Sequence, residues 1–271
     1  MSILAIDIGN TAIKLGLFDG KQLLYRETIA DLNQLTESLL KIQPYLVDRK
    51  LDIAVSSVVP QTAAQLRTIV TDTLEASTTL HWTWLTRETL AHKIGPLDIS
   101  AYEDGQIGAD RVANMLGAIE AFPDQNCLVI GIGTMTTFNL IDKTGRYMGG
   151  AITPGPAKFL SLTGKAHTAQ LLSVEHFSAP NAAFGRSTQE CLDIGLYRGY
   201  QGLLQNIIQS LLTAAGETQA NTTLVLTGGD SKVLTTMLQE NLSMAIHDDP
   251  DLTLKGIAYY LQISQLPEFQ K

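Results

Sequence analysis

Two short segments combine small polar residues with glycine in a way that suits phosphate binding. The first is Asp7-Ile8-Gly9-Asn10-Thr11, at the end of an apolar run. The second is Gly131-Ile132-Gly133-Thr134, which ends the apolar run that begins at Leu128. Glycine lets the backbone approach a ligand closely, and successive N–H groups in such a turn form an anion cradle. The pair predicts two phosphate-binding hairpins, one in each half of the chain, that clamp a nucleotide between two lobes.

Asp7 is the residue of the first segment with the clearest chemistry. A carboxylate at the end of a strand can hold the water shell of Mg²⁺, while the amides of the glycine turn meet phosphate oxygens. The alternative is an ordinary hairpin in which Asp7 only helps to form the turn. Lys14 is the candidate positive charge beside Asp7. The alternative is that Lys14 is only a residue at the edge of the strand.

The second segment also invites a dinucleotide-binding interpretation, because Gly-x-Gly after a strand is half of that fingerprint. The third glycine is missing, and the residues that follow favour a strand instead of the required helix. The hydroxyl groups of Thr134, Thr136 and Thr137 suit phosphate oxygens better.

Two further segments are candidates for substrate and nucleotide contacts. Gly108-Ala109-Asp110-Arg111 opens a predicted helix, where Asp110 can be a simple cap or can accept a proton from a substrate hydroxyl. Arg111 suits a carboxylate or a phosphoryl group. Thr227-Gly228-Gly229-Asp230 is a third glycine turn that a ligand could approach closely. Its place in the chain order is where the second lobe would cover an adenine. The alternative is that it only connects a strand to a helix. The five histidines have no metal-ligand spacing, and His247-Asp248-Asp249 is expected to be a solvated turn.

The hydrophobic pattern predicts the same order of elements twice: three short strands, a helix, a strand and a helix. The first half contains strands at 2–8, 12–18, 21–29, 51–59 and 78–85, helices at 31–46 and 60–76 with Asp31 as an N-cap, and an irregular loop at 94–107. A helix from about Ala109 to before Pro123 separates the halves. The second half contains strands at 127–132, 134–141, 146–152 and 224–227 and helices at 154–172, 188–214, 231–239 and 251–262. We expect an α/β fold of two domains, residues 1–122 and 123–271.

Composition narrows the class of protein. The chain has 271 residues and a net charge of −8, which argues against non-specific binding to nucleic acid or to an anionic membrane. Cys127 and Cys191 lie in apolar segments and are expected to be small buried hydrophobes in a reducing compartment. Asp7 interrupts the first apolar run, so no signal peptide is expected, and no run approaches the roughly 20 apolar residues of a membrane span. A soluble cytoplasmic protein is expected.

Taken together and in order, these segments resemble the type III pantothenate kinase family of the actin/hexokinase-like ATPase superfamily. The resemblance spans almost the whole chain. It is carried by the segments above and by Ser56-Ser57-Val58-Val59-Pro60, Pro96-Leu97, Gly149-Gly150-Ala151-Ile152 with Pro154-Gly155, Gly185-Arg186-Ser187-Thr188, Gly195-Leu196-Tyr197 with Gly199-Tyr200, and Leu252-Thr253-Leu254 with Gly256. It implies duplicated ribonuclease H-like domains, each with a mixed central sheet flanked by helices.

The resemblance implies ATP-dependent phosphorylation of the primary hydroxyl of pantothenate, the first step of coenzyme A biosynthesis. Asp110 would be the catalytic base, and Gly108, Ala109, Arg111, Tyr102 and a partner's Thr188 would form the pantothenate site. The phosphate and ATP contacts would be Asp7, Gly9, Asn10, Thr11, Lys14, Gly133, Thr134, Thr136, Gly228 and Gly229. It further implies Mg²⁺ at Asp7, a monovalent cation such as K⁺ or NH₄⁺, and a homodimer with shared active sites.

The chain departs from the family pattern at three positions. Gly131 and Asn139 stand where aspartates are usual, and Gly131 removes a carboxylate associated with the monovalent cation. Ala101 replaces the usual pantothenate-side tyrosine, with Tyr102 one place on. Two other functions stay open: a kinase of the same superfamily for another small alcohol, and a nucleotide-binding regulatory protein without turnover. Retention of Asp7 and Asp110 favours the enzyme.

Overall fold

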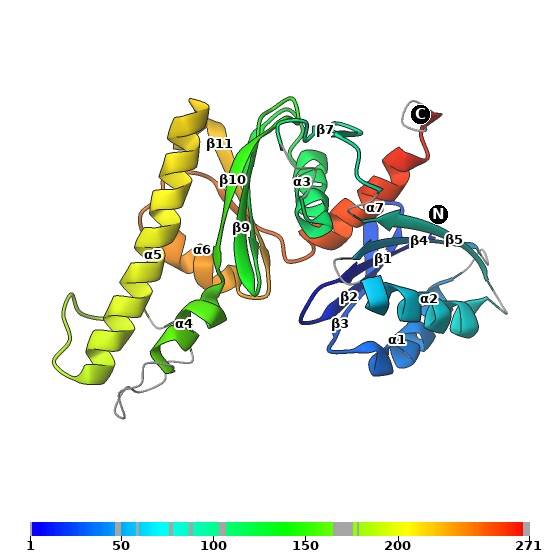
Figure 1. The fold of residues 1–271 in the computed structure, drawn as a ribbon, viewed down its shortest axis with the longest axis horizontal. Coiled ribbons are helices and arrows are strands. Elements are labelled where there is room, and N and C mark those ends of the chain that lie inside the picture. Colours follow the sequence, from blue (N-terminus) through cyan, green and yellow to red (C-terminus); the bar gives the residue numbers. More distant parts are fainter. Residues whose placement is uncertain are drawn as a thin grey trace. The chain divides into compact units, whose positions relative to one another are not determined.

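The computed structural model describes residues 2–46, 50–57, 60–75, 78–86, 89–102, 107–164, 176–177 and 179–267. They form two compact units, which appear as separate sheets with their own helices in Figure 1. The first unit runs to Pro123 and includes Gly145–Tyr147 and the chain from Asp251 onward. The second unit comprises Asp124–Thr144 and Met148–Pro250.

A five-stranded sheet with the order β3-β2-β1-β4-β5 forms the centre of the first unit. The strands are β1 (Ser2–Ile8), β2 (Ile13–Asp19), β3 (Gln22–Ile29), β4 (Lys50–Ser57) and β5 (Thr79–Leu85). β1 pairs antiparallel with β2 and parallel with β4, so β1 and β4 end at the same edge of the sheet. The predicted strands are thus confirmed where they are described. The loop predicted at 94–107 contains part of a short hairpin, β6 (Lys93–Ile94) and β7 (Leu97–Asp98).

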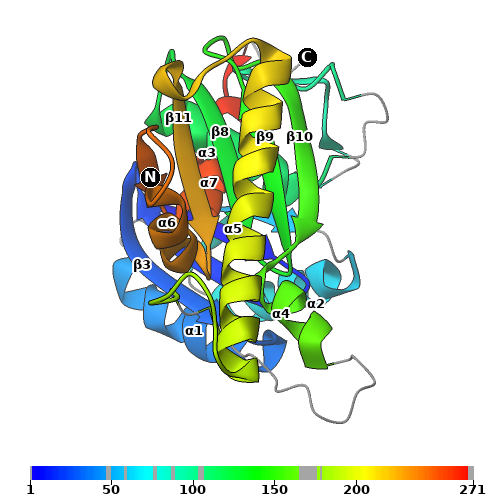
Figure 2. The ribbon, with the colours of Figure 1, turned by 90° about the vertical axis from the view of Figure 1, so that its left-hand side faces the viewer.

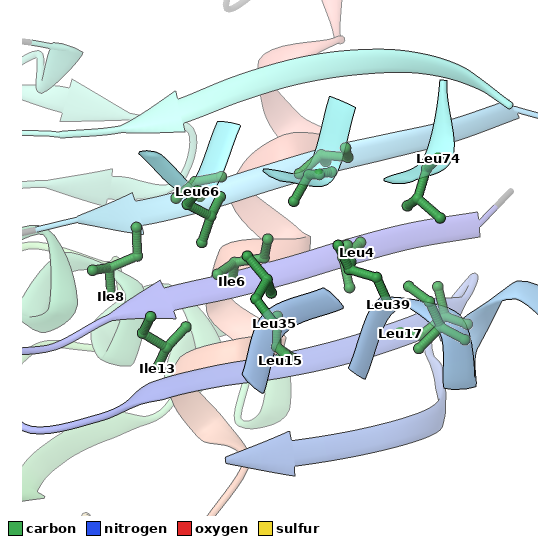
Figure 3. Packing of buried hydrophobic residues seen from close by; sticks show 14 of the residues in the cluster. Leu4, Ile6, Ile8, Ile13, Leu15, Leu17, Leu35, Leu39, Leu66 and Leu74 are labelled. Atoms are coloured by element: carbon green, nitrogen blue, oxygen red, sulfur yellow. The ribbon is translucent and has the colours of Figure 1, made fainter. Parts of the chain in front are cut away.

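Helices cover both faces of this sheet. Leu4, Ile6 and Ile8 of β1 point to the face covered by α1 (Leu35–Ile42) and α2 (Pro60–Leu74), as Figure 3 shows. Because successive side chains of a strand alternate, Asp7 points to the opposite face. That face is covered by α7 (Leu252–Ser264), which crosses α3 (Ala109–Ala121).

Two glycines allow α3 and α7 to cross closely. A Cβ atom on Gly256 would lie 1.8 Å from the carbonyl oxygen of Ala113, and one on Gly117 would lie 2.6 Å from that of Leu252. The Thr253 hydroxyl also donates a hydrogen bond of 2.7 Å to Asn114 Oδ1. This crossing explains why α7 packs in the first unit, although residues 251–271 were assigned to the second domain. The division of the chain into domains after residue 122 stays a prediction.

The second unit repeats the strand order of the first. Its sheet has the order β10-β9-β8-β11-β12. The strands are β8 (Asn126–Ile132), β9 (Met135–Ile141), β10 (Tyr147–Pro154), β11 (Thr222–Gly228) and β12 (Ile246–Asp248). The long helix α5 (Thr188–Ala215) runs along one face of this sheet, next to α6 (Ser231–Gln239) (Figure 2). The expected solvated turn at His247 and Asp248 is wrong, because these residues form β12 in parallel pairing with β11.

Several local predictions have mixed outcomes. Asp31 caps the helical segment as expected, by accepting a hydrogen bond from Asn33 N, but the predicted helix 31–46 is α1 flanked by 3₁₀ turns at 32–34 and 43–45. α4 (Pro156–Gly164) begins where a helix was expected, and 165–172 lie outside the described residues. Cys127 is buried, whereas Cys191 is exposed on α5, so its predicted burial is wrong. None of the helices in the described ranges is long and apolar enough to cross a membrane.

Candidate functional site

Asp7 lies at the centre of a row of polar residues near the end of β1. Across the sheet it pairs with Lys14 on β2 and with Ser56 on β4. Asp7 is 8% exposed, and burial raises the pKa of its carboxyl group from 3.8 to about 6. The positive charge of Lys14 opposes this pKa shift, whereas the negative charge of Asp110 adds to it. Burial and Asp110 outweigh Lys14, so the protein alone incompletely stabilises a negative charge on Asp7.

Asp110 sits in the first turn of α3, two residues after the N-cap residue Gly108. Its side chain is half-buried. A Cβ atom on Gly108 would lie only 2.4 Å from Asp110 Oδ1, so the carboxylate lies over the space that glycine leaves. The structure therefore brings Asp110 into electrostatic range of Asp7. Ala109, which lies between Gly108 and Asp110, is buried and has no polar side-chain group.

Arg111 is held by two tyrosines. Its Nη1 donates a hydrogen bond of 3.3 Å to the hydroxyl of Tyr102, and its Nη2 donates one of 3.2 Å to the hydroxyl of Tyr147. The guanidinium carbon also lies 5.4 Å from the centre of the Tyr102 ring. Arg111 itself is only 5% exposed. The expected closeness of Tyr102 and Arg111 is therefore present, and Tyr147 joins them.

The first glycine hairpin joins β1 to β2. Gly9 N donates a hydrogen bond of 3.1 Å to the carbonyl oxygen of Ala12, which closes a tight turn. A Cβ atom on Gly9 would lie 3.2 Å from that same oxygen, so a larger residue would crowd the turn. Asn10 and Thr11 are exposed at its tip. Lys14 follows on β2, on the same face of the sheet as Asp7.

The second hairpin joins β8 to β9 and is supported by the end of β10. Gly133 N donates to Met135 O at 3.2 Å, and Gly155 N donates to Thr134 O at 3.0 Å. A Cβ atom on Gly155 would lie 1.9 Å from Gly133 O, so only glycine fits there. Gly133 and Thr134 are exposed, as a phosphate contact requires.

Thr136 differs from its neighbours in the second hairpin. It is fully buried, and its hydroxyl lies 2.9 Å from the hydroxyl of Tyr200 on α5. Strand alternation turns Thr136 towards the α5 side, whereas Thr137 points to the opposite face. This position favours a structural role for Thr136, and its contact with phosphate stays a prediction.

The Gly228-Gly229 turn lies at the same edge of the second sheet as the second hairpin. Gly228 pairs with Ile132 across the parallel strands β11 and β8. Its φ angle is +111°, and a Cβ atom there would lie 1.9 Å from Ile132 O. Gly229 is open, with nothing within 4 Å of an added Cβ atom. Ligands of open α/β sheets bind at the carboxyl ends of parallel strands, which is where this turn lies.

Gly131 occupies the position in the second sheet that Asp7 occupies in the first. It pairs with Thr137 on β9 and with Thr227 on β11. Thr227 is 1% exposed, and no described residue provides a hydrogen-bond partner for its Oγ1 atom. Asn139, two residues along β9 from Thr137, is fully buried. The row Thr137–Gly131–Thr227 thus offers neutral oxygens where the first sheet has a carboxylate.

Thr188 is the first residue of α5 and is exposed. The preceding Ser187 caps the helix by accepting a hydrogen bond from Glu190 N. Among the described residues, no three His, Cys, Asp or Glu side chains gather in a group that could hold a metal ion. Asp7 stays a candidate ligand for an ion.

A family model for type III pantothenate kinase matches residues 3–210. The chain belongs to this family. Type III pantothenate kinases from Sphingopyxis alaskensis and Legionella pneumophila are 32% and 33% identical to it, over 95% and 94% of this chain and 96% of each relative. The enzyme from Thermus thermophilus is 32% identical over 94% of this chain and 96% of its own length. The protein is accordingly a phosphotransferase, as its sequence motifs implied.

Solved structures with other descriptions are similar to this chain in fold. A Campylobacter jejuni protein, described as a conserved putative Baf family transcriptional activator, superposes with a TM-score of 0.55 at 20% identity, covering 97% of this chain and 98% of that one. The activator of 2-hydroxyisocaproyl-CoA dehydratase from Clostridium difficile gives a TM-score of 0.50 at 11% identity, covering 98% and 96%. At these identities the likeness concerns fold alone. The repeated sheets have the duplicated ribonuclease H-like architecture of the actin/hexokinase-like ATPases.

Three residues that the structure places at these sites have no role predicted from the sequence. Ser56 flanks Asp7 on β4, Gly155 supports the second hairpin, and Tyr147 holds Arg111. Ser56 and Gly155 lie in segments that carry the family resemblance. Tyr147 had no such signal, because its contact with Arg111 joins residues 36 positions apart.

Proposed function

We propose that this protein transfers the γ-phosphoryl group of ATP to the primary hydroxyl of pantothenate, the first step of coenzyme A biosynthesis. Membership of the family supports the substrates. The observation that carries the chemistry is the closeness of Asp7 and Asp110, whose charges interact although one lies on a strand and the other on a helix. A phosphotransferase needs one carboxylate near the phosphates and another near the accepting hydroxyl.

Asp110 acts as the base in this proposal. Its half-buried carboxylate accepts the proton of the pantothenate hydroxyl as that oxygen attacks the γ-phosphorus. Arg111 binds the substrate carboxylate, because its guanidinium can make two parallel hydrogen bonds to such a group. Gly108, Ala109 and Tyr102 line the same end of α3 and complete the pantothenate contacts, with Thr188 of a second copy.

The phosphates of ATP bind to backbone N–H groups of the two hairpins. In the first unit, Gly9, Asn10, Thr11 and Lys14 form the contact, and Lys14 supplies a positive charge beside the hairpin. In the second unit, Gly133 and Thr134 contact phosphate, and Gly228 and Gly229 lie against the adenosine. The exposure of Asn10, Thr11 and Thr134 and the open space beside Gly229 support this assignment.

Asp7 fits a role toward Mg²⁺. Burial disfavours its negative charge, and a divalent cation with its water shell would supply the positive charge that Lys14 does not fully provide. When bound, Mg²⁺ neutralises charge that develops on the phosphate oxygens. A K⁺ or NH₄⁺ ion is proposed near Gly131, with Thr227 as a neutral oxygen ligand.

We propose a homodimer in which Thr188 completes the pantothenate site of the partner. The exposed face of α5 carries Gly195, Gly199 and Gly202, and an added Cβ atom on each would meet nothing within 4 Å. Each glycine inside a helix costs about 0.5–1 kcal/mol relative to alanine, so a bare glycine face suits close packing against another chain. Use of ATP supports action in the cytoplasm.

The test is release of ADP in a coupled assay with pantothenate, pantetheine and several sugars as acceptors, at fixed ATP and Mg²⁺. Turnover that requires pantothenate, with 4′-phosphopantothenate as product, is the expected result. Turnover only with another alcohol would make the protein a different small-alcohol kinase. ATP binding without turnover on any acceptor would make it a regulatory nucleotide-binding protein.

A further inference from the structure

Tyr147 is separated from the rest of β10 by its packing. Gly145–Tyr147 belong to the first unit, whereas Met148 and the residues after it belong to the second. Tyr147 is 5% exposed, although the next residue, Met148, is exposed. The chain therefore leaves the second unit for three residues and buries an aromatic side chain beside the start of α3.

Backbone contacts fix this three-residue segment against the β6–β7 hairpin. Asp98 N donates a hydrogen bond of 2.9 Å to Gly145 O, and Asp98 forms a parallel bridge with Arg146. Gly145 has a φ angle of +83°, and a Cβ atom on it would lie 2.1 Å from Pro96 O. Both the conformation and the close approach require glycine, so the segment is held at a defined place.

The β6–β7 hairpin, which receives these contacts, is followed closely in the chain by Tyr102. Tyr102 N donates a hydrogen bond of 2.9 Å to Ile99 O, one residue after Asp98. The rings of Tyr102 and Tyr147 lie with their centres 5.8 Å apart at 54°. The two phenol oxygens accept hydrogen bonds from different guanidinium nitrogens of Arg111. Two tyrosines from distant parts of the chain thus set the plane of one guanidinium group.

A neutral hydrogen-bond donor or acceptor such as the phenol of Tyr147 suits an arginine that must bind an anion. Burial raises the pKa of the Tyr147 hydroxyl, and the positive charge of Arg111 and its hydrogen bond oppose this shift only in part. Tyr147 therefore stays protonated at physiological pH. Its hydrogen bond orients Arg111 without neutralising its charge, which a carboxylate partner would do.

We propose that Tyr147, together with Tyr102, is a positioning residue that selects a carboxylate-bearing substrate by orienting Arg111. This rests on the proposed function, in which Arg111 binds the carboxylate of pantothenate. Tyr147 acts through Arg111 and takes no part in phosphoryl transfer. Its loss should therefore change substrate binding and leave the chemical step intact.

The test is Tyr147→Phe, which removes only the hydroxyl, assayed with pantothenate and with pantothenol, whose hydroxymethyl group replaces the carboxylate. We expect the KM for pantothenate to rise about tenfold, since a hydrogen bond to a charged group has an effect of that order. The kcat, the KM for ATP and the KM for pantothenol should change less than about twofold. Calorimetric titration with pantothenate should show the same loss of affinity without turnover. Tyr260→Phe is the matched control, because it removes a half-buried hydroxyl from α7 in the same unit.

Three outcomes would overturn the proposal. If the KM for pantothenate is unchanged in Tyr147→Phe while Arg111→Gln raises it, Tyr147 has no part in substrate binding, although the proposed function stands. An equal loss with pantothenol and pantothenate would mean a general structural effect. If Tyr147→Phe does not fold, Tyr102→Phe tests the other phenol in the same way, and equal losses on both substrates again contradict the proposal. Absence of pantothenate turnover in the unaltered protein would instead reject the proposed function.

Discussion

The backbone of Gly108 lies directly beneath the carboxylate of Asp110, where a Cβ atom would come within 2.4 Å of Oδ1. The glycine and the acid are therefore one structural unit at the start of α3. A helix N-terminus favours a nearby negative charge, which suits a carboxylate at this position. Substitution of Asp110 therefore tests whether the carboxylate is needed, and substitution of Gly108 tests whether its position matters.

Asp110→Asn removes the base and keeps the shape of the side chain. We expect kcat to fall about 10²–10⁴-fold, the usual range for loss of a general base, with fold and dimer unchanged. Circular dichroism and sedimentation establish the fold and assembly, and a coupled ADP assay measures turnover. Near-full activity would remove Asp110 from the mechanism.

Gly108→Ala keeps the carboxylate but displaces it. The clashing atom is the end of a side chain that can rotate away, so the fold should survive while kcat falls at least tenfold, since small misplacements of reacting groups are costly. Gly256→Ala is the contrast, because its Cβ atom would lie 1.8 Å from the backbone of Ala113 and should unfold the α3–α7 crossing. If Gly108→Ala had the activity of the unaltered protein, the position of Asp110 would not matter.

Asp7→Asn should stabilise the ligand-free protein at neutral pH. Burial raises the pKa of Asp7 from 3.8 to about 6, so its favourable contribution is full below pH 3.8 and is lost as the pH rises through about 6. The ionised form then destabilises the fold by about 3 kcal/mol, which the neutral amide avoids. Denaturant unfolding should show a gain above pH 6 that disappears near pH 4.

The same variant should lose ATP turnover and the stabilisation that Mg²⁺ and ATP give to the unaltered protein. Asp72→Asn, at an exposed position of α2, is the control and should change neither property. A destabilised Asp7→Asn protein at pH 8 would mean that Lys14 compensates the buried charge after all.

The hydrophobic pattern of the sequence made most of this architecture predictable. β1, β8 and α6 have the predicted bounds or differ by one residue, because apolar runs and glycine turns mark their ends. Long-range packing was not predictable from such patterns. The return of α7 to the first unit depends on close contact of Gly256 with α3, and the contact of Tyr147 with Arg111 depends on Gly145. The three residues of β12 are too few and too polar to show a strand period.

The homodimer is tested by replacing Gly195, Gly199 and Gly202 together with alanine. In an unpartnered helix these changes should stabilise the chain, since alanine is the better helix former. We expect them to weaken the dimer at least tenfold in sedimentation, because three methyl groups would separate the packed helices. Asp72→Ala, in the first unit, is the control. A stable monomer with full activity in the unaltered protein would reject both the dimer and a shared role for Thr188.

The monovalent cation offers a test of the difference between the two sheets. Asp7 of the first sheet is matched in the second by Gly131, flanked by Thr137 and Thr227. Hydroxyl groups supply dipoles to a K⁺ ion, whereas an aspartate supplies a full charge, so the ion should bind weakly here. We therefore expect activation by K⁺ or NH₄⁺ to require higher concentrations than in relatives that carry aspartate. Gly131→Asp should lower the half-activating K⁺ concentration about tenfold.

A titration of rate against K⁺, with a bulky organic cation that keeps ionic strength constant, measures this requirement. Thr227→Val is the companion variant, because it removes a buried oxygen that has no partner among the described residues while preserving the volume of the side chain. It should raise the half-activating concentration, and Gly131→Asp should offset that rise. Tight saturation by K⁺ in the unaltered protein, unchanged by either substitution, would place the ion away from Gly131.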